Sequence, residues 1–342
     1  MSAVTRGSAI AALTVTACLL GTPAALAAGR GGAGSQETET SGDSSGQALL
    51  SKVAFKVQGA PSKVRRSGSL TPTAVGWKAP ACWYEPYWKA EDFKTFTEAK
   101  WSMHKSAGGD PKDLADAKAR YKGGHPYKNF NAGKNGKGMW WVAVENPDMR
   151  DDPAAGACTR PPFWVDKGKA PKVPRAIDPK TLAALAYQQT KVPDTKVELK
   201  PAAKSTVNLP TWVWLDKGTF KEVKVRAELP GTGLFAETTA KPVSLHLEPG
   251  SEDAETYPAS GECTFNKDGS IGTPYTKGSS KQSPPCGITY LRASGGRPNQ
   301  LTASVTWQIS WHGTGDAHGP LPDGTFETTQ DMDVQEVQSI NR

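Results

Sequence analysis

The sequence predicts a mainly β protein with a smaller α+β module, ending in an immunoglobulin-like antiparallel β-sandwich. Three observations lead to this fold class. Apolar and polar residues alternate with a period of two, most clearly over residues 301–311. The 342-residue chain contains 27 prolines and 35 glycines, which suit a loop-rich β protein. Four cysteines lie beyond residue 75, and disulfides are typical of exported domains.

The C-terminal region, residues 205–342, supplies the sandwich. Between Leu301 and Trp311 every second residue is apolar and the residues between them are polar. A period of two means that one face of the strand is buried and the other is wet. Similar runs predict short strands at 211–215, 223–227, 233–238, 243–247, 287–291, 301–311 and 332–337. Such a set, with turn signals between its members, indicates two packed sheets.

Residues 76–175 predict a small Trp-rich α+β module that is stapled by a disulfide. The module holds seven of the eleven tryptophans. Residues 91–105 have the spacing of a helix whose apolar face includes Phe93 and Phe96. The remaining elements are a second helix over 112–122, opened by an Asp110-Pro111 cap, and a strand over 139–144.

Residues 176–204 predict a short helix followed by a Pro-rich connection. Asp178-Pro179 is a cap of the same kind and opens a helix over residues 180–189. Pro193 and Pro201 then interrupt any regular structure, so the chain is expected to run extended into the sandwich.

The first 27 residues read as a secretory signal peptide. Arg6 supplies the positive charge, residues 7–20 are apolar, and Ala25-Leu26-Ala27 offers a small-residue cleavage site. Cys18 leaves an alternative, because Val15 to Cys18 also fits a lipobox that would anchor a lipoprotein through this cysteine. No second apolar stretch follows, so no transmembrane span is expected in the mature chain. Residues 28–75 are rich in Gly, Ser and Thr and are expected to form a disordered linker, with a short helix or strand over Gln47 to Val57 as the alternative for that part.

Without Cys18, the cysteines form an even set of four, which indicates two disulfides in an oxidising compartment. Four cysteines allow three pairings. We favour Cys82–Cys158 and Cys263–Cys286, because each pair lies within one compositional region. The second pair is too close in sequence for the inter-sheet bridge of an immunoglobulin domain, so it is expected to staple the loop 264–285.

The charge is divided between the two regions. The chain carries a net charge of +7, and residues 75–175 hold 18 Lys and Arg against 12 Asp and Glu. Residues 205–342 hold 11 against 16. The basic region is suited to an anionic cell wall or to the acidic region, although an incidental solvated surface explains it equally well. The lysines are scattered rather than clustered, so nucleic acid is not an expected partner.

An aromatic cluster is the candidate binding surface. Flat ring faces bind sugars, and the polar tips of Tyr and Trp add hydrogen bonds. The alternative is that these residues form the core of the small module, and exposure of Trp83 or Trp88 would distinguish the two. The members are Trp83, Tyr84, Tyr87, Trp88, Trp140 and Trp141.

Seven segments resemble a family of secreted actinobacterial proteins known mainly from Streptomyces. They are PACWYEP (80–86), GMWW (138–141), LAYQQ (185–189), VNLPTW (207–212), GTPY (272–275), VTWQISW (305–311) and VQEVQSIN (334–341). The resemblance covers nearly all of the chain beyond residue 75. It implies secretion, and the label "enoyl reductase" that members of the family often carry implies a nicotinamide enzyme.

Tyr187 and Lys191 match the Tyr-x-x-x-Lys pair of short-chain reductases, in which the phenol donates a proton and the ammonium lowers its pKa. Three observations oppose this role. Val192 precedes Pro193, so the helix is expected to end at or before Lys191. No Gly-x-Gly-x-x-Gly segment follows a predicted strand. An exported protein also meets little NADPH.

A metal site at His312, Asp316 and His318 is weakly indicated, because the spacing of these residues fits no known ligand pattern.

These observations predict a secreted, non-enzymatic protein that performs a binding or structural task at the cell envelope or in the extracellular space. Its expected partner is a cell-wall glycan or an envelope protein. The alternative is an enzyme, either a reductase using Tyr187 and Lys191 or a hydrolase without a recognised motif. No catalytic, cofactor-binding or metal-binding residue is assigned.

Overall fold

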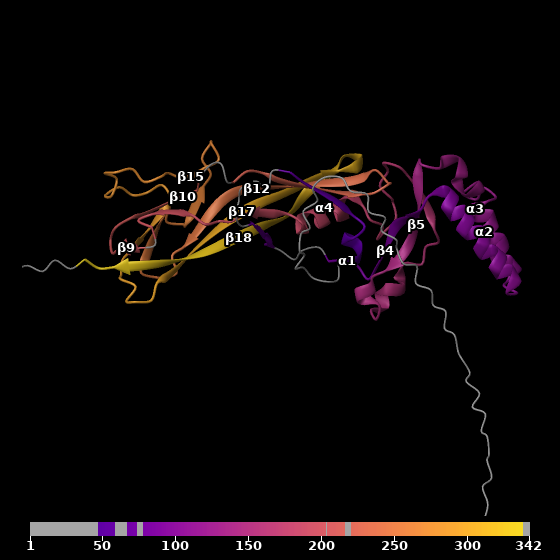
Figure 1. Ribbon diagram of the computed structural model, residues 1–342, viewed down its shortest axis with the longest axis horizontal. Helices are drawn as coiled ribbons and strands as arrows, with labels where there is room; N and C mark the ends of the chain where they lie inside the picture. The colour runs from indigo at the N-terminus through magenta and orange to yellow at the C-terminus, as the bar shows by residue number, and fades with distance from the viewer. Residues whose placement is uncertain (1–46, 59–66, 74–77, 203, 216–219, 338–342) are drawn as a thin grey trace, which may run out of the picture. The chain divides into compact units, whose positions relative to one another are not determined.

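Two antiparallel β-sheets organise the chain, as the computed structural model shows (Figure 1). The structure describes residues 47–58, 67–73, 78–202, 204–215 and 220–337. They belong to one compact unit, Asp43–Arg342. The expected signal peptide and Cys18 lie outside the described residues. The fold is mainly β, as the alternating pattern predicts.

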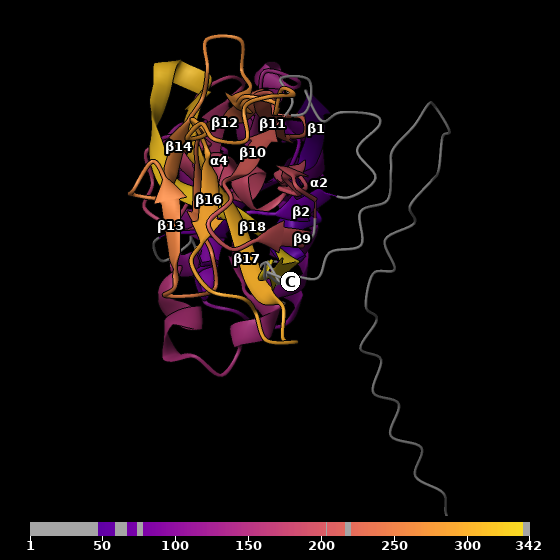
Figure 2. The ribbon, with the colours of Figure 1, turned by 90° about the vertical axis from the view of Figure 1, so that its left-hand side faces the viewer.

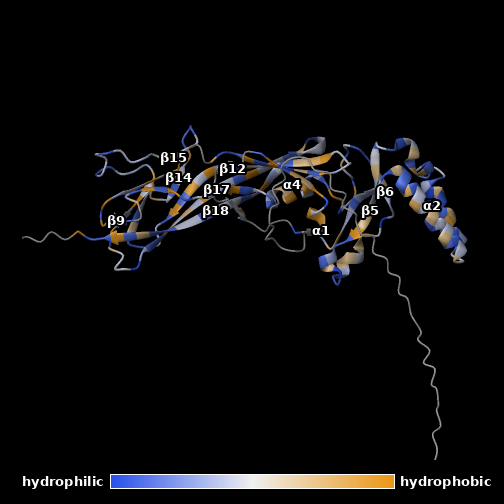
Figure 3. Cartoon of the chain, viewed as in Figure 1, coloured by the Kyte–Doolittle hydropathy of each residue, from blue (hydrophilic) through white to orange (hydrophobic). Residues whose placement is uncertain are grey.

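The larger sheet, called the long sheet here, has its strands in the order β1-β11-β12-β17-β18-β3. Two short strands extend it: β14 pairs with β12, and β9 pairs with β18 in parallel. The bounds are β1 Ala54–Gln58, β3 Thr71–Pro72, β9 Lys204–Thr206, β11 Val223–Leu229, β12 Leu234–Glu248, β14 Glu262–Thr264, β17 Asn299–Gly313 and β18 Ala317–Gln335. Figure 3 shows hydrophobic and hydrophilic residues alternating along the central strands.

The smaller sheet, called the short sheet, has the order β13-β16-β10-β15, and β8 pairs with β10. Its strands are β8 Glu198–Lys200, β10 Thr211–Leu215, β13 Ala254–Tyr257, β15 Ile271–Gly272 and β16 Gly287–Tyr290. Figure 2 shows β10, β13 and β16 of this sheet together with β17 and β18. A first hydrophobic core takes residues from both sheets, among them Val305 and Trp307 of β17, Val213 of β10 and Ile288 of β16. The period-two pattern therefore records a face that is buried against a second sheet.

Strand β12 corrects the sequence prediction, which placed separate strands at 233–238 and 243–247. The chain instead runs through as one strand, with a register shift against β17 between Pro242 and Ser244. Pro242 has no N–H to give to the ladder, so a bulge beside it lets the strand continue. Pro242 thus marks an irregularity within one strand, whereas the sequence pattern suggested a turn between two separate strands.

Both favoured disulfides are present, Cys82–Cys158 and Cys263–Cys286. The second one differs from its expected role. Cys263 lies on β14 of the long sheet, opposite Leu245 of β12. Cys286 directly precedes β16 of the short sheet, and its carbonyl accepts from the N–H of Val213 in β10. The bridge therefore joins the two sheets as well as closing the 264–285 loop.

A second core joins the Trp-rich region to the long sheet. The three-stranded sheet of this region consists of β4 (Cys82–Trp88), β5 (Gly138–Glu145) and β6 (Phe163–Asp166) in the order β4-β5-β6. Helix α4, Pro179–Gln188, lies against β11 and β12 and is capped by the carboxylate of Asp178, which accepts from the N–H of Thr181 at 2.7 Å. Trp141 and Phe163 share one core with Leu182 of α4 and Val225 of β11. The two regions that the sequence suggested as separate modules thus pack through common side chains.

Within the expected linker, the described residues 47–58 and 67–73 form regular structure, the first of them where a short helix or strand was the alternative. They contain α1 (Gln47–Leu50), β1, β2 (Ser67–Ser69) and β3. Strand β2 pairs with β7, Lys191–Pro193. Strands β1 and β3 pair with β11 and β18, so this one segment covers both edges of the long sheet. Few apolar residues anchor this segment to the rest of the fold. One of them is Leu49, which is only 1% exposed.

Two helices complete the Trp-rich region. Helix α2, Ala90–Ser106, and helix α3, Pro111–Tyr121, lie within a residue or two of their predicted bounds. A third core beneath them contains Phe93, Tyr121, Phe130 and Trp140. No helix among the described residues is long and apolar enough to span a membrane.

Candidate ligand groove

The aromatic residues expected to form one surface are divided by the fold. Trp83, Tyr84, Trp140 and Trp141 are buried in the cores. The reason is that β4–β6 is covered on both faces. Trp140 packs with Phe93 below α2, and its neighbour Trp141 points to the opposite face, toward α4. Only Tyr87 and Trp88 reach the surface, so the predicted surface is wrong for the other four residues.

Buried polar atoms around these tryptophans are mostly paired within the fold. The indole N–H of Trp83 donates to Glu85 Oε2 at 2.8 Å, and Lys52 Nζ lies 3.7 Å from Glu85 Oε1. The indole N–H of Trp140 donates to the carbonyl of Phe130 at 3.1 Å. Donors committed to internal partners are not free for a ligand. Trp83 and Trp140 therefore have structural roles.

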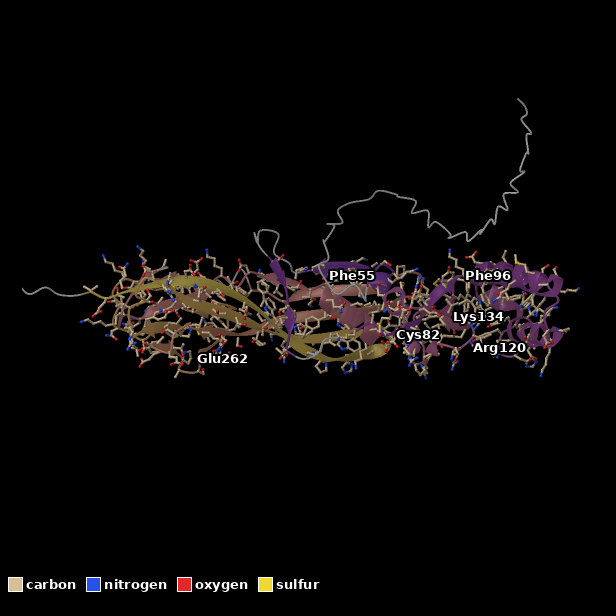
Figure 4. The ribbon with its side chains drawn as sticks, turned by 90° about the horizontal axis from the view of Figure 1, so that it is seen from below. Phe55, Cys82, Phe96, Arg120, Lys134 and Glu262 are labelled. Carbon is tan, nitrogen blue, oxygen red and sulfur yellow. A yellow bond between two sulfur atoms is a disulfide. The ribbon has the colours of Figure 1, made fainter. Side chains whose placement is uncertain are left out.

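Three aromatic side chains form a stacked group at the surface, here called the aromatic edge: Tyr87, Trp88 and Phe96. Trp88 and Phe96 are stacked with ring centroids 4.7 Å apart, and Tyr87 meets Trp88 edge-on at 4.4 Å. Tyr87 is 52% exposed and Phe96 is 48% exposed, whereas Trp88 is half-buried and packs against the third core. Phe96 is labelled in Figure 4. Stacked rings cover the faces that they share, so the aromatic edge offers a ligand the exposed parts of Tyr87 and Phe96.

Sequence reasoning missed Phe96 as a surface residue, because the apolar spacing that predicts the helix places Phe96 with Phe93 on its apolar face. The buried residues of α2 are Ala90, Phe93 and Thr97. At about 100° per residue, Phe96 lies roughly 100° away from the centre of that buried stripe. The structure thus turns the ring of Phe96 away from the core.

Beside the aromatic edge lies a groove between α2 and α3 with a volume of about 520 Å³. Trp88 and Phe96 form part of its wall, and α3 contributes Leu114 and Ala117. Its charged lining residues come from different elements: Lys100 and His104 from α2, Asp113 from α3, and Arg160 from the loop before β6. The lining is completed by Phe93, Thr97, Trp101, Tyr121, Val142, Ala143 and Pro162. A largely apolar groove with a few polar groups is the usual form of a ligand site.

Tyr121 is a buried residue of this lining with a polar hydroxyl. Its hydroxyl donates to the carbonyl of Pro162 at 3.2 Å. Burial raises the pKa of Tyr121 to about 12, although the nearby Arg120 acts in the opposite direction. The phenol therefore stays neutral at physiological pH. It ties α3 to the loop that carries Arg160.

The turn between α2 and α3 fixes one end of the groove. Gly108 has a φ of +72°, and a Cβ on Gly109 would collide with the imidazole of His104. His104 Nε2 lies 3.2 Å from the carbonyl of Asp110, a hydrogen bond that requires the proton on Nε2. The Asp110 carboxylate caps α3 by accepting from the N–H of Lys112 at 2.8 Å. Two glycines and a cap thus determine where the helices diverge.

A strained segment supports α2 from below. Asn129, Phe130 and Asn131 all have positive φ, at 43°, 56° and 55°. Such angles are rare for a bulky residue and cost on the order of 1–3 kcal/mol each. Phe130 is fully buried, and its ring lies 5.3 Å from that of Trp101 in the groove lining. Aromatic packing in the third core holds the strained backbone in place.

The reductase pair is not assembled. Helix α4 ends at Gln188, and Lys191 lies in β7, where its Nζ donates to Ser69 Oγ at 2.6 Å. The Tyr187 hydroxyl is buried without a hydrogen-bond partner in the described chain. It packs against Gly324, where an added Cβ would lie 2.5 Å from it. The neighbouring strand pairs β2–β7 and β17–β18 are antiparallel, unlike the parallel sheet of a nucleotide-binding fold.

The histidines at the tip of the β17–β18 hairpin do not form a metal site with Asp316. His312 and His318 lie opposite each other in the ladder, and His318 Nδ1 is 2.8 Å from the carbonyl of Asp316. Over the described ranges, no three His, Cys, Asp or Glu side chains converge in a way that would hold a metal ion.

The groove combines the partly exposed Trp88–Phe96 stack with the cationic side chains of Lys100 and Arg160. The hydroxyl of Tyr121 in its lining is engaged in a hydrogen bond to the Pro162 carbonyl. Comparisons with protein-family models, curated proteins and solved structures found no match.

Proposed function

We propose that the protein is a secreted, non-enzymatic binding protein of the cell envelope, and that it binds a glycan through the aromatic edge and the adjoining groove. The observation that carries this proposal is the Trp88–Phe96 stack, which lines the groove and in which half-buried Trp88 supports the exposed ring of Phe96. Sugar rings pack their apolar faces on such surfaces. The two disulfides favour an oxidising compartment outside the cytoplasm.

The resemblance to secreted actinobacterial proteins belongs to the same proposal and supports the location. We also propose that the two sheets form an immunoglobulin-like sandwich that carries the groove. Their shared core and the Cys263–Cys286 bridge between them support this architecture. The long strands β12, β17 and β18 continue beyond the part that faces the short sheet and reach α4. This extension gives the sandwich an attachment to the Trp-rich region.

The reductase alternative has less support. A catalytic phenol must reach its substrate, but the Tyr187 hydroxyl is enclosed beside Leu70 and Gly324. A partner lysine would lie one turn further along the same helix, whereas Lys191 is in a strand. Calorimetry with NADPH tests this alternative directly. We expect no heat of binding, and a measurable affinity would revive the reductase hypothesis.

The proposal is tested by sedimenting the protein with insoluble cell-wall material. We expect Trp88→Ala to reduce retention at least fivefold, since one aromatic stack contributes about 1 kcal/mol or more. Leu291→Ala is the control, because Leu291 is an apolar surface residue, 44% exposed, that lies outside the groove. Circular dichroism checks that both variants fold. Equal retention of Trp88→Ala and wild type, or no retention by any envelope fraction, would contradict the proposal.

A further inference from the structure

The groove carries positive charge that the protein itself does not neutralise. Lys100 and Arg160 both line it and are exposed. Among the described residues, neither has a carboxylate within 4.0 Å, whereas Lys122 and Lys134 nearby are paired with Glu98 and Asp166. The one acidic residue in the lining, Asp113, forms no ion pair within the described chain.

The two cations are held by different parts of the fold. Lys100 follows Phe96 by four residues on α2, so the ammonium group and the ring share one face of the helix. The Arg160 backbone N–H donates to the Tyr84 hydroxyl at 2.9 Å, and its guanidinium lies 5.9 Å from the centre of the Phe163 ring. The main chain of Arg160 is thus fixed while its charged group remains available.

We propose that the ligand of this groove is an acidic glycan, in which a sugar ring packs against the exposed ring of Phe96, supported by Trp88, and an attached carboxylate or phosphate contacts Lys100 and Arg160. This inference rests on the proposed function and specifies its substrate class. Four residues of helix, about 6 Å, separate Phe96 from Lys100 along the helix axis. That step suits a pyranose ring and its acidic substituent. The excess of Lys and Arg over residues 75–175 adds a long-range attraction for a polyanion.

The test is calorimetric titration of the whole chain with oligogalacturonate and with its fully methyl-esterified form, which is neutral and otherwise matched. We expect the acid to bind at least tenfold more tightly at low salt, with the difference shrinking as salt is added. A phosphomannan serves as a third arm. A preference for it over oligogalacturonate identifies the acidic group as phosphate, and the reverse order identifies it as carboxylate.

Variants separate a built site from general attraction to a basic surface. Lys100→Gln and Arg160→Gln should each weaken binding of the acid about fivefold and leave binding of the ester unchanged. Lys105→Gln is the control, because Lys105 is exposed on α2 but does not line the groove. Equal effects of Lys100→Gln and Lys105→Gln would overturn the inference.

The two proposals fail in different ways. Equal affinity for the acid and the ester, both lost in Trp88→Ala, would refute the acidic ligand and leave glycan binding intact. Binding to none of the three glycans, together with no retention on cell-wall material, would refute both.

Discussion

Tyr187 illustrates how packing decides the chemistry open to one side chain. Its hydroxyl lies against Gly324 and has no hydrogen-bond partner in the described chain. Burial, and to a lesser degree the negative charge of Asp323, raises the pKa of Tyr187 to about 12. A phenol in this setting is a poor proton donor at neutral pH, because its proton is held more tightly than in water.

Replacing Tyr187 with Phe tests this description. At pH 7 we expect the free energy of unfolding to stay within about 0.5 kcal/mol of wild type, because no hydrogen bond is lost. The pKa of Tyr187 in the folded protein exceeds its value of about 10 in the unfolded chain. The contribution of the neutral phenol to the free energy of unfolding is therefore complete below pH 10 and is lost as the pH rises toward 12. Between pH 10 and pH 12, the free energy of unfolding of Tyr187→Phe should therefore fall less than that of wild type, by up to about 2 kcal/mol.

Urea unfolding at pH 7 and at several values above pH 10 measures this effect. Tyr87→Phe is the control, since Tyr87 is 52% exposed and should leave the alkaline decline unchanged. A loss of more than 1 kcal/mol at pH 7 in Tyr187→Phe would show that the hydroxyl has a partner. The description of an enclosed, unpaired phenol would then be wrong.

At the same scale, the sequence identified the right kind of residue for the site but not the right members. It singled out Trp88 and Tyr87 together with four buried aromatic residues. Burial of Trp140 and Trp141 on opposite faces depends on α2 and α4 covering both sides of β5. This coverage depends on tertiary packing, which the spacing of residues along the chain does not reveal. Phe96 was missed for a related reason, since its angle from the buried stripe of α2 is defined only once the structure shows which residues of the helix are buried.

Among the elements, the capped helices were the most predictable. Asp110 and Asp178 each precede a proline, and each carboxylate accepts a backbone N–H as the cap pattern implies. The long strand β12 was less predictable, because a proline in a strand pattern usually signals an end. The strand can continue because β17 pairs with the residues of β12 before and after the bulge.

The two caps should differ in their contribution to stability. Helix α4 is almost wholly buried, whereas α3 is exposed apart from the face that lines the groove. Asp178→Ala leaves the Thr181 N–H without its acceptor in a partly buried site, so we expect a loss of about 1–2 kcal/mol. Asp110→Ala should cost about 0.5–1 kcal/mol, because water replaces the cap. Denaturant unfolding compares the two, and an equal or reversed order would contradict the difference in burial.

For the molecule as a whole, composition suggested two modules and a tether, and the packing is more continuous. Trp141 of the Trp-rich region and Val225 of the long sheet meet in one core around α4. The composition of residues 28–75 allowed a short helix or strand over 47–57 but concealed β2 and β3, because a segment that pairs along sheet edges needs only a few apolar anchors. The remaining stabilisation comes from backbone hydrogen bonds to β11 and β18. These pairings join residues far apart in the chain, so the local sequence does not reveal them.

The segment 47–73 is therefore expected to be part of the folding unit, which Leu49→Ala tests. Leu49 is 1% exposed in the second core, so its truncation should lower the free energy of unfolding by about 2–4 kcal/mol. Val57→Ala is the control, because Val57 belongs to the same segment but is 52% exposed, and it should change stability by less than 0.5 kcal/mol. Urea unfolding followed by tryptophan fluorescence reports on both variants. A single transition shifted by Leu49→Ala would show that the segment, the long sheet and the Trp-rich region unfold together. An unshifted transition would mean that residues 47–73 dock on a body that is stable without them, as a true tether would.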